Sequence, residues 1–234
     1  MKQIVICLFL IFSCQIVFAQ DELTIDYDAI KLQVENENSN YFYPKLLGRF
    51  NSFDETLTLK EYALIYYGFS FQNDYLKQQP NEAIIDTLLK SENYEQLVTE
   101  CAKILKKNPV SLKANNNMGF ALFKLNKPES EWEKYQNRYR AIRKVIVLSG
   151  NGLSCETAFK VIYVSDEYNM IYSYFDIEKI YEQSLVNLCD KFEVEKSEYY
   201  QANEIFFDIS RKLIRQSDFD KELKMLEEKI EYEN

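Results

Sequence analysis

The sequence predicts an α+β protein, in which an N-terminal helical domain is followed by a small four-stranded antiparallel sheet and a C-terminal helix. Apolar residues recur at helical spacing through much of residues 20–148. An Asn-Gly pair then marks a turn, and segments rich in β-branched and aromatic residues follow without long helical crossovers. Such consecutive strands favour an antiparallel meander. The expected divisions are a leader at 1–19, a helical region at 20–148, and the sheet with its closing helix at 149–234.

Two helices are recognisable in the first half of the helical region. Thr58 and Glu61 have the spacing of a capping box, in which a hydroxyl and a carboxylate satisfy backbone donors reciprocally, so a helix begins there. Residues 94–107 form the next helix, because their apolar side chains recur every three or four positions. Pro109 ends it, and two lysines in its last turn suit the negative end of the helix dipole.

Two more helices follow the proline. Residues 111–126 place Gly119 and several alanines and apolar side chains on one face, and residues 130–148 carry an aromatic and aliphatic stripe. This arrangement resembles one tetratricopeptide repeat, in which a helix ends in Asn-Pro, a short turn follows, and the next helix carries Gly and Ala on its inner face. The next copy is not recognisable. We therefore expect one tetratricopeptide-like unit covered by neighbouring helices, and not a solenoid.

The predicted sheet begins after Gly152. Partial alternation of apolar residues and a high content of β-branched and aromatic residues indicate strands, and the acidic tetrapeptide at 166–169 reads as a turn between two of them. The tail from 219 to 234 returns to helical spacing. The four expected strands are 157–165, 170–177, 183–195 and 203–210.

The N-terminus has the pattern of a secretory signal peptide. Lys2 supplies a positive charge, an apolar run follows, and Ala19 is a small residue before a cut at Gln20. The run is interrupted and shorter than the roughly 20 residues of a membrane anchor. A weaker alternative is a lipoprotein acylated at Cys14. The protein is therefore expected to be exported, periplasmic or secreted, with no integral membrane segment after cleavage.

Composition excludes several functions. The chain has 234 residues, a net charge of −9 and no histidine. An acidic protein repels nucleic acid and anionic lipid, so neither is an expected partner. Without histidine there is no Ser-His-Asp or Cys-His machinery and no histidine zinc site. Five scattered glycines form no phosphate loop. No metal, cofactor or catalytic residue is predicted.

Three cysteines lie beyond the leader. An odd number leaves one free thiol or an intermolecular bond. Cys101 falls on an apolar helical stripe and is expected to be a small core residue. Cys155 and Cys189 form a possible disulfide, which export would permit, although the sequence does not establish their separation.

Three residues of the helical region are candidate binding residues. Tyr66 and Tyr67 could anchor a partner as rigid aromatic side chains, but aromatic residues at helical spacing usually fill a core, and these two would then fill the junction between helices and sheet. Arg49 could bind a ligand carboxylate through both nitrogens of its guanidinium group. It could equally cap a helix or pair with a nearby acid.

Two acidic residues of the predicted turn complete the candidate set. Asp166 and Glu167 lie next to Tyr168, and paired acids perform acid–base chemistry when burial separates their pKa values. Adjacent side chains of a turn usually point apart into water, so the favoured interpretation is a turn preference. Asp190 is expected to fix the sheet through a hydrogen bond.

Six short segments, in their order along the chain, resemble a family of exported bacterial proteins described as a domain of unknown function. The resemblance spans nearly the whole chain after the leader. It implies a tetratricopeptide-like helical half and a terminal sheet, and it implies no activity. The segments are YPKLLGRF at 43–50, YALIYYGFSF at 62–71, SGNG at 149–152, SDEYNMIY at 165–172, LCDKFEV at 188–194 and IFFDIS at 205–210.

Two functions remain open on the sequence alone. The first is a protein- or peptide-interaction module of the cell envelope, suggested by the repeat-like unit, the 18 tyrosines and 16 phenylalanines, and the lack of catalytic groupings. The alternative is a histidine-free hydrolase of envelope polymers that uses carboxylates. This enzyme would need a deep cleft in which Asp166 or Glu167 faces another acid at a glycosidase-like separation.

Overall fold

The computed structural model describes residues 23–73, 75–76 and 82–233, with no side-chain detail beyond 221. The predicted leader and Cys14 therefore lie outside the described residues. The elements are α1 Tyr27–Glu35, α2 Tyr43–Asn51, α3 Leu59–Phe69, α4 Ala83–Lys90, α5 Tyr94–Lys107, α6 Leu112–Lys124, α7 Glu129–Val147, β1 Phe159–Lys160, α8 Val164–Asn169, the π-helix η1 Met170–Tyr174, β2 Ile180–Val186, β3 Cys189–Val194, β4 Glu204–Asp208 and α9 Ser210–Glu233.

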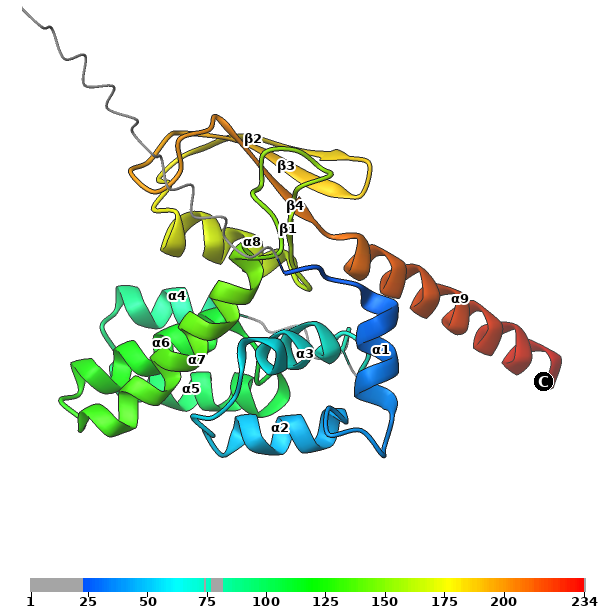
Figure 1. The fold of residues 1–234 in the computed structure, drawn as a ribbon, viewed down its shortest axis with the longest axis horizontal. Coiled ribbons are helices and arrows are strands. Elements are labelled where there is room, and N and C mark those ends of the chain that lie inside the picture. Colours follow the sequence, from blue (N-terminus) through cyan, green and yellow to red (C-terminus); the bar gives the residue numbers. More distant parts are fainter. Residues whose placement is uncertain (1–22, 74, 77–81, 234) are drawn as a thin grey trace, which may run out of the picture.

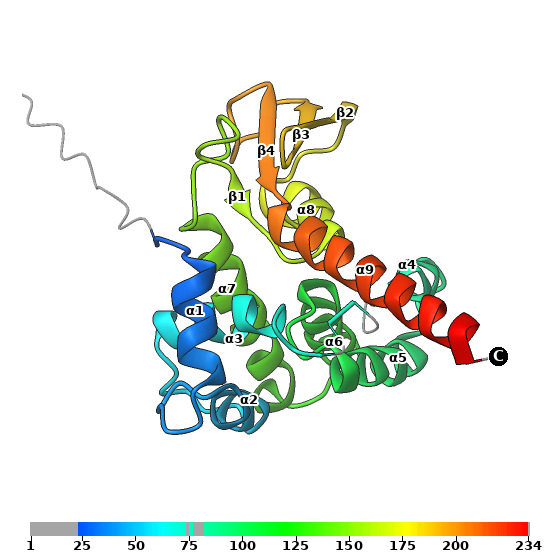
Figure 2. The same ribbon diagram turned by 90° about the vertical axis from the view of Figure 1, so that its right-hand side faces the viewer.

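The protein is α+β, with a helical part, a four-stranded sheet and a C-terminal helix. Figures 1 and 2 show the sheet over one end of the helical part, with α8 between them. Helices α3, α5, α6 and α7 begin within one residue of the predicted positions, whereas the C-terminal helix begins at Ser210, nine residues before the predicted start at 219. Thr58 and Glu61 form the reciprocal capping box of α3, and Asn93 and Ser111 accept backbone hydrogen bonds at the first turns of α5 and α6. The expected C-terminal helix is confirmed as α9.

Helices α5 and α6 pack against each other through small and apolar side chains. Leu97 and Cys101 of α5 are fully buried in the same cluster as Ala114 and Ala121 of α6. The side chain of Gln136 on α7 lies against Gly119, and a Cβ atom there would lie 2.6 Å from its amide nitrogen. A larger residue at this position would therefore displace the Gln136 side chain.

The sheet is mixed, and the prediction of a purely antiparallel meander is wrong. Strand β1 pairs with β4 in parallel, and the strand order is β1-β4-β3-β2. The other two pairings are antiparallel. The single predicted strand at 183–195 is instead a hairpin that contains the end of β2, a turn with Asn187 at a φ of 58°, and β3.

The segment predicted as a turn and a strand, residues 166–177, is mostly helical. It forms most of α8 and then η1, and its buried positions recur every three or four residues, as in Glu167, Met170, Ile171 and Phe175. This period is helical. Two of the buried positions are the acidic residues Asp166 and Glu167. Because hydropathy counts acidic residues as exposed, the helical spacing of the buried positions is not visible in the sequence.

Of the segment predicted as a strand at 157–165, only Phe159 and Lys160 join the sheet, and its last two residues already belong to α8. Beyond them, tyrosine hydroxyls take the place of a neighbouring strand. The hydroxyl of Tyr67 donates to the carbonyl of Lys160 (3.1 Å), and the hydroxyl of Tyr75 donates to the carbonyl of Ile162. Buried backbone groups require such partners, so the aromatic side chains of the helical part hold this segment in place.

Candidate functional site

Tyr66 and Tyr67 lie at the junction between the helices and the sheet. Both side chains are fully buried on α3. The Tyr66 hydroxyl accepts from the amide of Ile162 (3.2 Å) and donates to Asp166 Oδ2 (2.7 Å). Burial raises the pKa of both phenols, so both stay neutral. The structure therefore places these two residues in a packed core and not on a binding surface.

Arg49 connects the end of α2 to the start of α3. Its Nε donates to Asp54 Oδ2 (2.7 Å), Nη1 pairs with Glu61, and Nη2 donates to the hydroxyl of Thr56 (3.2 Å). Hydrogen bonds from Thr56 and from Arg49 lower the pKa of Asp54 to about 2. All three nitrogens are thus engaged by the protein itself.

Asp166 and Glu167 are buried on α8, contrary to the expectation of an exposed turn. Their exposed fractions are 3 % and 0 %. Burial raises the pKa of each carboxyl group well above its ordinary value, opposed for Asp166 by the hydrogen bond from Tyr66. These carboxyl groups favour their neutral forms in the folded protein.

Glu167 lies near Asp190, and after burial the charge of Asp190 is the next cause that raises the pKa of Glu167. Neither side-chain oxygen of Glu167 has a hydrogen-bond partner among the described residues. Asp190 accepts from Gln183 Nε2 (3.2 Å), and Gln183 Oε1 accepts from the Tyr168 hydroxyl (2.6 Å). The two carboxyl groups of a glycosidase flank the bond that they cleave, so they must be open to a substrate. Glu167 and Asp190 are instead buried, with exposed fractions of 0 % and 7 %.

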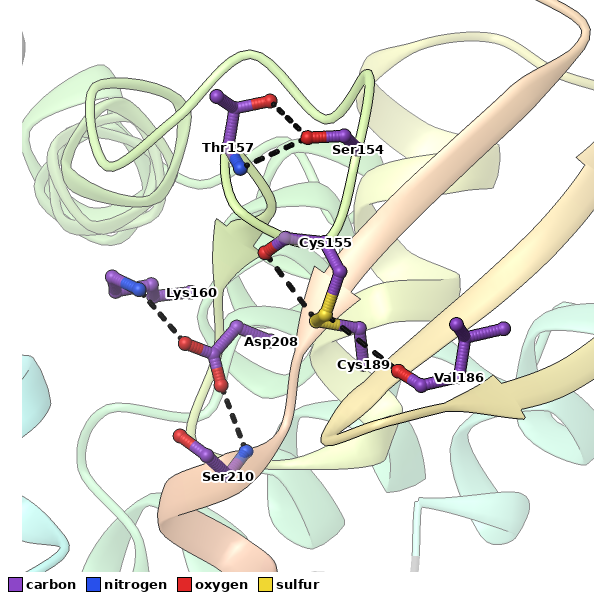
Figure 3. The surroundings of a disulfide bond; sticks show 8 residues. All are labelled: Ser154, Cys155, Thr157, Lys160, Val186, Cys189, Asp208 and Ser210. Atoms are coloured by element: carbon purple, nitrogen blue, oxygen red, sulfur yellow. Dashed lines mark hydrogen bonds and ion pairs between the residues drawn. A yellow bond between two sulfur atoms is a disulfide. The ribbon is translucent and has the colours of Figure 1, made fainter.

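The loop before β1 is attached to the sheet by a disulfide bond. Cys155 and Cys189 are joined, with their Cα atoms 5.7 Å apart (Figure 3). Close to the bond, the Lys160 ammonium pairs with Asp208 Oδ2 (2.8 Å), and the other oxygen of Asp208 accepts from the backbone of Ser210. Cys101 is free and buried. No cluster of three His, Cys, Asp or Glu residues in the described part of the chain could hold a metal ion.

A cleft of about 720 Å³ lies among α2, the end of α3, α5 and α7, and we call it the helical cleft. Its lining combines aromatic rings, amides and three cationic side chains, and includes no Asp or Glu. The lining residues are Tyr43, Leu47, Asn51, Phe53, Phe69, Gln72, Asn73, Ala102, Leu105, Lys106, Lys107, Pro109, Met118, Tyr135 and Arg138. The predicted residues Arg49, Tyr66, Tyr67, Asp166 and Glu167 are not among them.

Arg138 is the most unusual group of the helical cleft. Only 6 % of it is exposed, and one Nη nitrogen donates to the Phe50 carbonyl. Its guanidinium carbon lies 3.5 Å from the ring centre of Phe53 and 4.3 Å from that of Phe50. Nε has no hydrogen-bond partner. Burial without a carboxylate neighbour lowers the pKa of this arginine to about 10.

The contacts of Arg138 offset much of the cost of burying its charge, but none of them is with an anion. Removing a cation from water costs several kcal/mol. Each of the two cation–π contacts returns about 2 kcal/mol, and a hydrogen bond from a charged donor returns about 1.5–3 kcal/mol. Sequence reasoning missed Arg138, although it lies three residues after Tyr135 and four before Ile142, between members of the apolar stripe of α7.

The fold and the cleft together define an α+β protein with a cationic cleft between helices of its N-terminal half. The chain belongs to the family described as a domain of unknown function (DUF4919), whose model matches residues 28–218. No curated protein and no solved structure matches the chain significantly. Among the described residues, no helix has the length and apolar character needed to cross a membrane.

Proposed function

We propose that the protein is an exported interaction module that binds a peptide or protein segment in the helical cleft. The observation that carries this proposal is the cleft itself. Its volume of about 720 Å³ falls within the roughly 300–1,000 Å³ of ligand sites in proteins. Aromatic rings such as Phe53 and Tyr135 offer apolar contact, and the amides of Asn51 and Gln72 offer hydrogen bonds to a peptide backbone.

The arrangement of the helices supports this location. Ala102 and Leu105 of α5 and Tyr135 of α7 contribute to the cleft from two helices that flank α6. In the tetratricopeptide-like interpretation of α5 and α6, α7 begins the following unit, and the cleft lies on the face that the first helices of successive units share. The small side chain of Ala102, which is exposed, leaves this part of the cleft open.

Site-specific photo-crosslinking tests the proposal. A benzophenone amino acid at position 102, on the cleft, is compared in the producing cells with the same group at Thr99, an exposed residue of α5 outside the cleft lining. We expect adducts from position 102 that position 99 does not give, and that mass spectrometry assigns to a peptide segment. The same adducts from both positions, or none from position 102, would refute binding in the cleft.

Export is part of the proposal and has its own test. It is supported by the leader pattern at 1–19 and by the disulfide between Cys155 and Cys189, since disulfides persist in oxidising compartments. Mass spectrometry of the protein from cells should find Gln20 at the N-terminus. An acylated Cys14 would indicate a lipoprotein instead, and an intact N-terminus would refute cleavage.

A further inference from the structure

The charge of the helical cleft is opposite to that of the chain as a whole. The protein has 37 acidic and 28 basic residues, yet Lys106, Lys107 and Arg138 are the charged residues of the lining. The two lysines are exposed and form no ion pair with the described residues. The acidic residues nearby, Asp54 and Glu133 among them, line a neighbouring cavity that shares Phe53 and Arg138 with the cleft.

Arg138 lacks the anion that a buried guanidinium group normally has. The groups whose charges act on it are the phenols of Tyr135 and Tyr62, and no carboxylate is among them. Two aromatic rings lie close to its guanidinium carbon, Nε is buried, and one Nη nitrogen already donates to the Phe50 carbonyl, so the Nη end of the group is what remains for a ligand. The edge of a guanidinium group presents parallel N–H donors that match the two oxygens of a carboxylate.

We propose that the helical cleft recognises a carboxylate group of the bound peptide, with Arg138 as the anchor and with Lys106 and Lys107 attracting the acidic segment to the opening. This inference rests on the proposed peptide-binding function. The carboxylate belongs either to an acidic side chain or to the C-terminus of the peptide, because both present the same two oxygens. A ligand of this kind would supply the counter-charge that the protein itself does not provide.

Three fluorescent dodecapeptide pools distinguish the two sources. The first pool has Asp and Glu at alternate positions and an amidated C-terminus. The second pool has Asn and Gln at those positions and a free C-terminus. The third pool has Asn and Gln at those positions and an amidated C-terminus, so it carries no carboxylate. We expect the purified protein to bind the first or the second pool at least about tenfold more tightly than the third, as measured by anisotropy. The preferred pool identifies the source of the carboxylate.

Two substitutions locate the site. Arg138→Gln should weaken binding of the preferred pool by about tenfold or more and leave the third pool unaffected. Lys106→Gln should weaken binding by a smaller factor and reduce its dependence on salt. Lys90→Gln, an exposed lysine outside the cleft, is the matched control and should change neither quantity.

The outcomes separate this inference from the proposed function. Equal binding of all three pools, unaffected by Arg138→Gln, would overturn carboxylate recognition and leave peptide binding in place. If Arg138→Gln lowers the unfolding temperature and Lys106→Gln leaves the affinity unchanged, Arg138 has a structural role and the inference is wrong. If no pool binds, the inference also fails, and crosslinking from position 102 then decides whether the cleft has a partner of another kind.

Discussion

The bond between Cys155 and Cys189 should contribute a large share of the stability of the protein. The cysteines are 34 residues apart. In the chain-entropy model, a loop of this length lowers the entropy of the unfolded chain enough to stabilise the folded state by about 4 kcal/mol. The free energy of unfolding of an ordinary domain is about 5–15 kcal/mol. Replacing both cysteines by serine should therefore leave a folded but markedly weakened protein.

Urea unfolding measures this effect. With an m-value of about 2–3 kcal/mol/M, a loss of about 4 kcal/mol lowers the midpoint by about 1.3–2 M. The wild type in a phosphine reductant should unfold at the same lower urea concentration as the Cys155→Ser/Cys189→Ser variant, and the reductant should not affect that variant further. A midpoint that changes by less than about 0.3 M on reduction would show that the disulfide does not constrain the chain as the loop length requires.

Three other predictions concern the interior. Tyr66→Phe leaves Asp166 and a backbone amide without a hydroxyl partner and should lower the free energy of unfolding by about 2–3 kcal/mol in urea titrations. Stability should fall as pH rises above about 4.3, because unfolded Glu167 loses a proton that the folded protein retains. Glu167→Gln should make this decline shallower, by at most about 1.4 kcal/mol per pH unit, because one group contributes no more than one proton. Gly152→Ala should lower the free energy of unfolding by more than about 2 kcal/mol, because φ is 71° and the new Cβ would lie 2.4 Å from the Phe159 ring. In Gly48→Ala, within α2, the new Cβ meets nothing within 4 Å, so this control should raise the free energy of unfolding by about 0.5–1 kcal/mol in thermal unfolding.

Each of these has a contrary outcome. For the tyrosine, Tyr181→Phe on the exposed face of β2 is the control, and equal effects of the two substitutions would show that the buried hydrogen bonds contribute nothing. If the free energy of unfolding depends on pH in the same way for the wild type and for Glu167→Gln, the Glu167 carboxyl group is ionised in the folded state and the prediction is wrong. A neutral effect of Gly152→Ala would mean that the loop before β1 adjusts its backbone without loss.

Local rules predicted α3, α5, α6 and α7 correctly, because caps and apolar spacing act within a few residues. The capping box of α3 and the end of α5 before Pro109 are of this kind. The α8 segment failed because its buried positions are acids, and acids are buried only when tertiary partners exist. Those partners, Tyr66 and Asp190, lie 100 residues before and 23 after the acids they contact. No local pattern contains that information.

The candidate site was less predictable than the fold. Tyr66 and Tyr67 were identified as candidates together with their alternative as junction residues, and the structure places them at the junction. The helical cleft is assembled from α2, α3, α5 and α7, which are separated by long stretches of chain. Arg138 could have been suspected from the sequence, because it is an arginine among the apolar stripe positions of α7. That Arg138 has no carboxylate partner follows only from three-dimensional packing.

The position of β4 in the sheet determines when the protein can finish folding. This strand is the last of the four in sequence, yet it lies between β3 and β1 and supplies the partner of each. During synthesis, helices α1 to α7 are complete before residue 204 leaves the ribosome, while β1 has no strand to pair with until then. Because pairing between distant segments is slow, the emerging chain carries a formed helical half and an unclosed sheet until β4 has appeared.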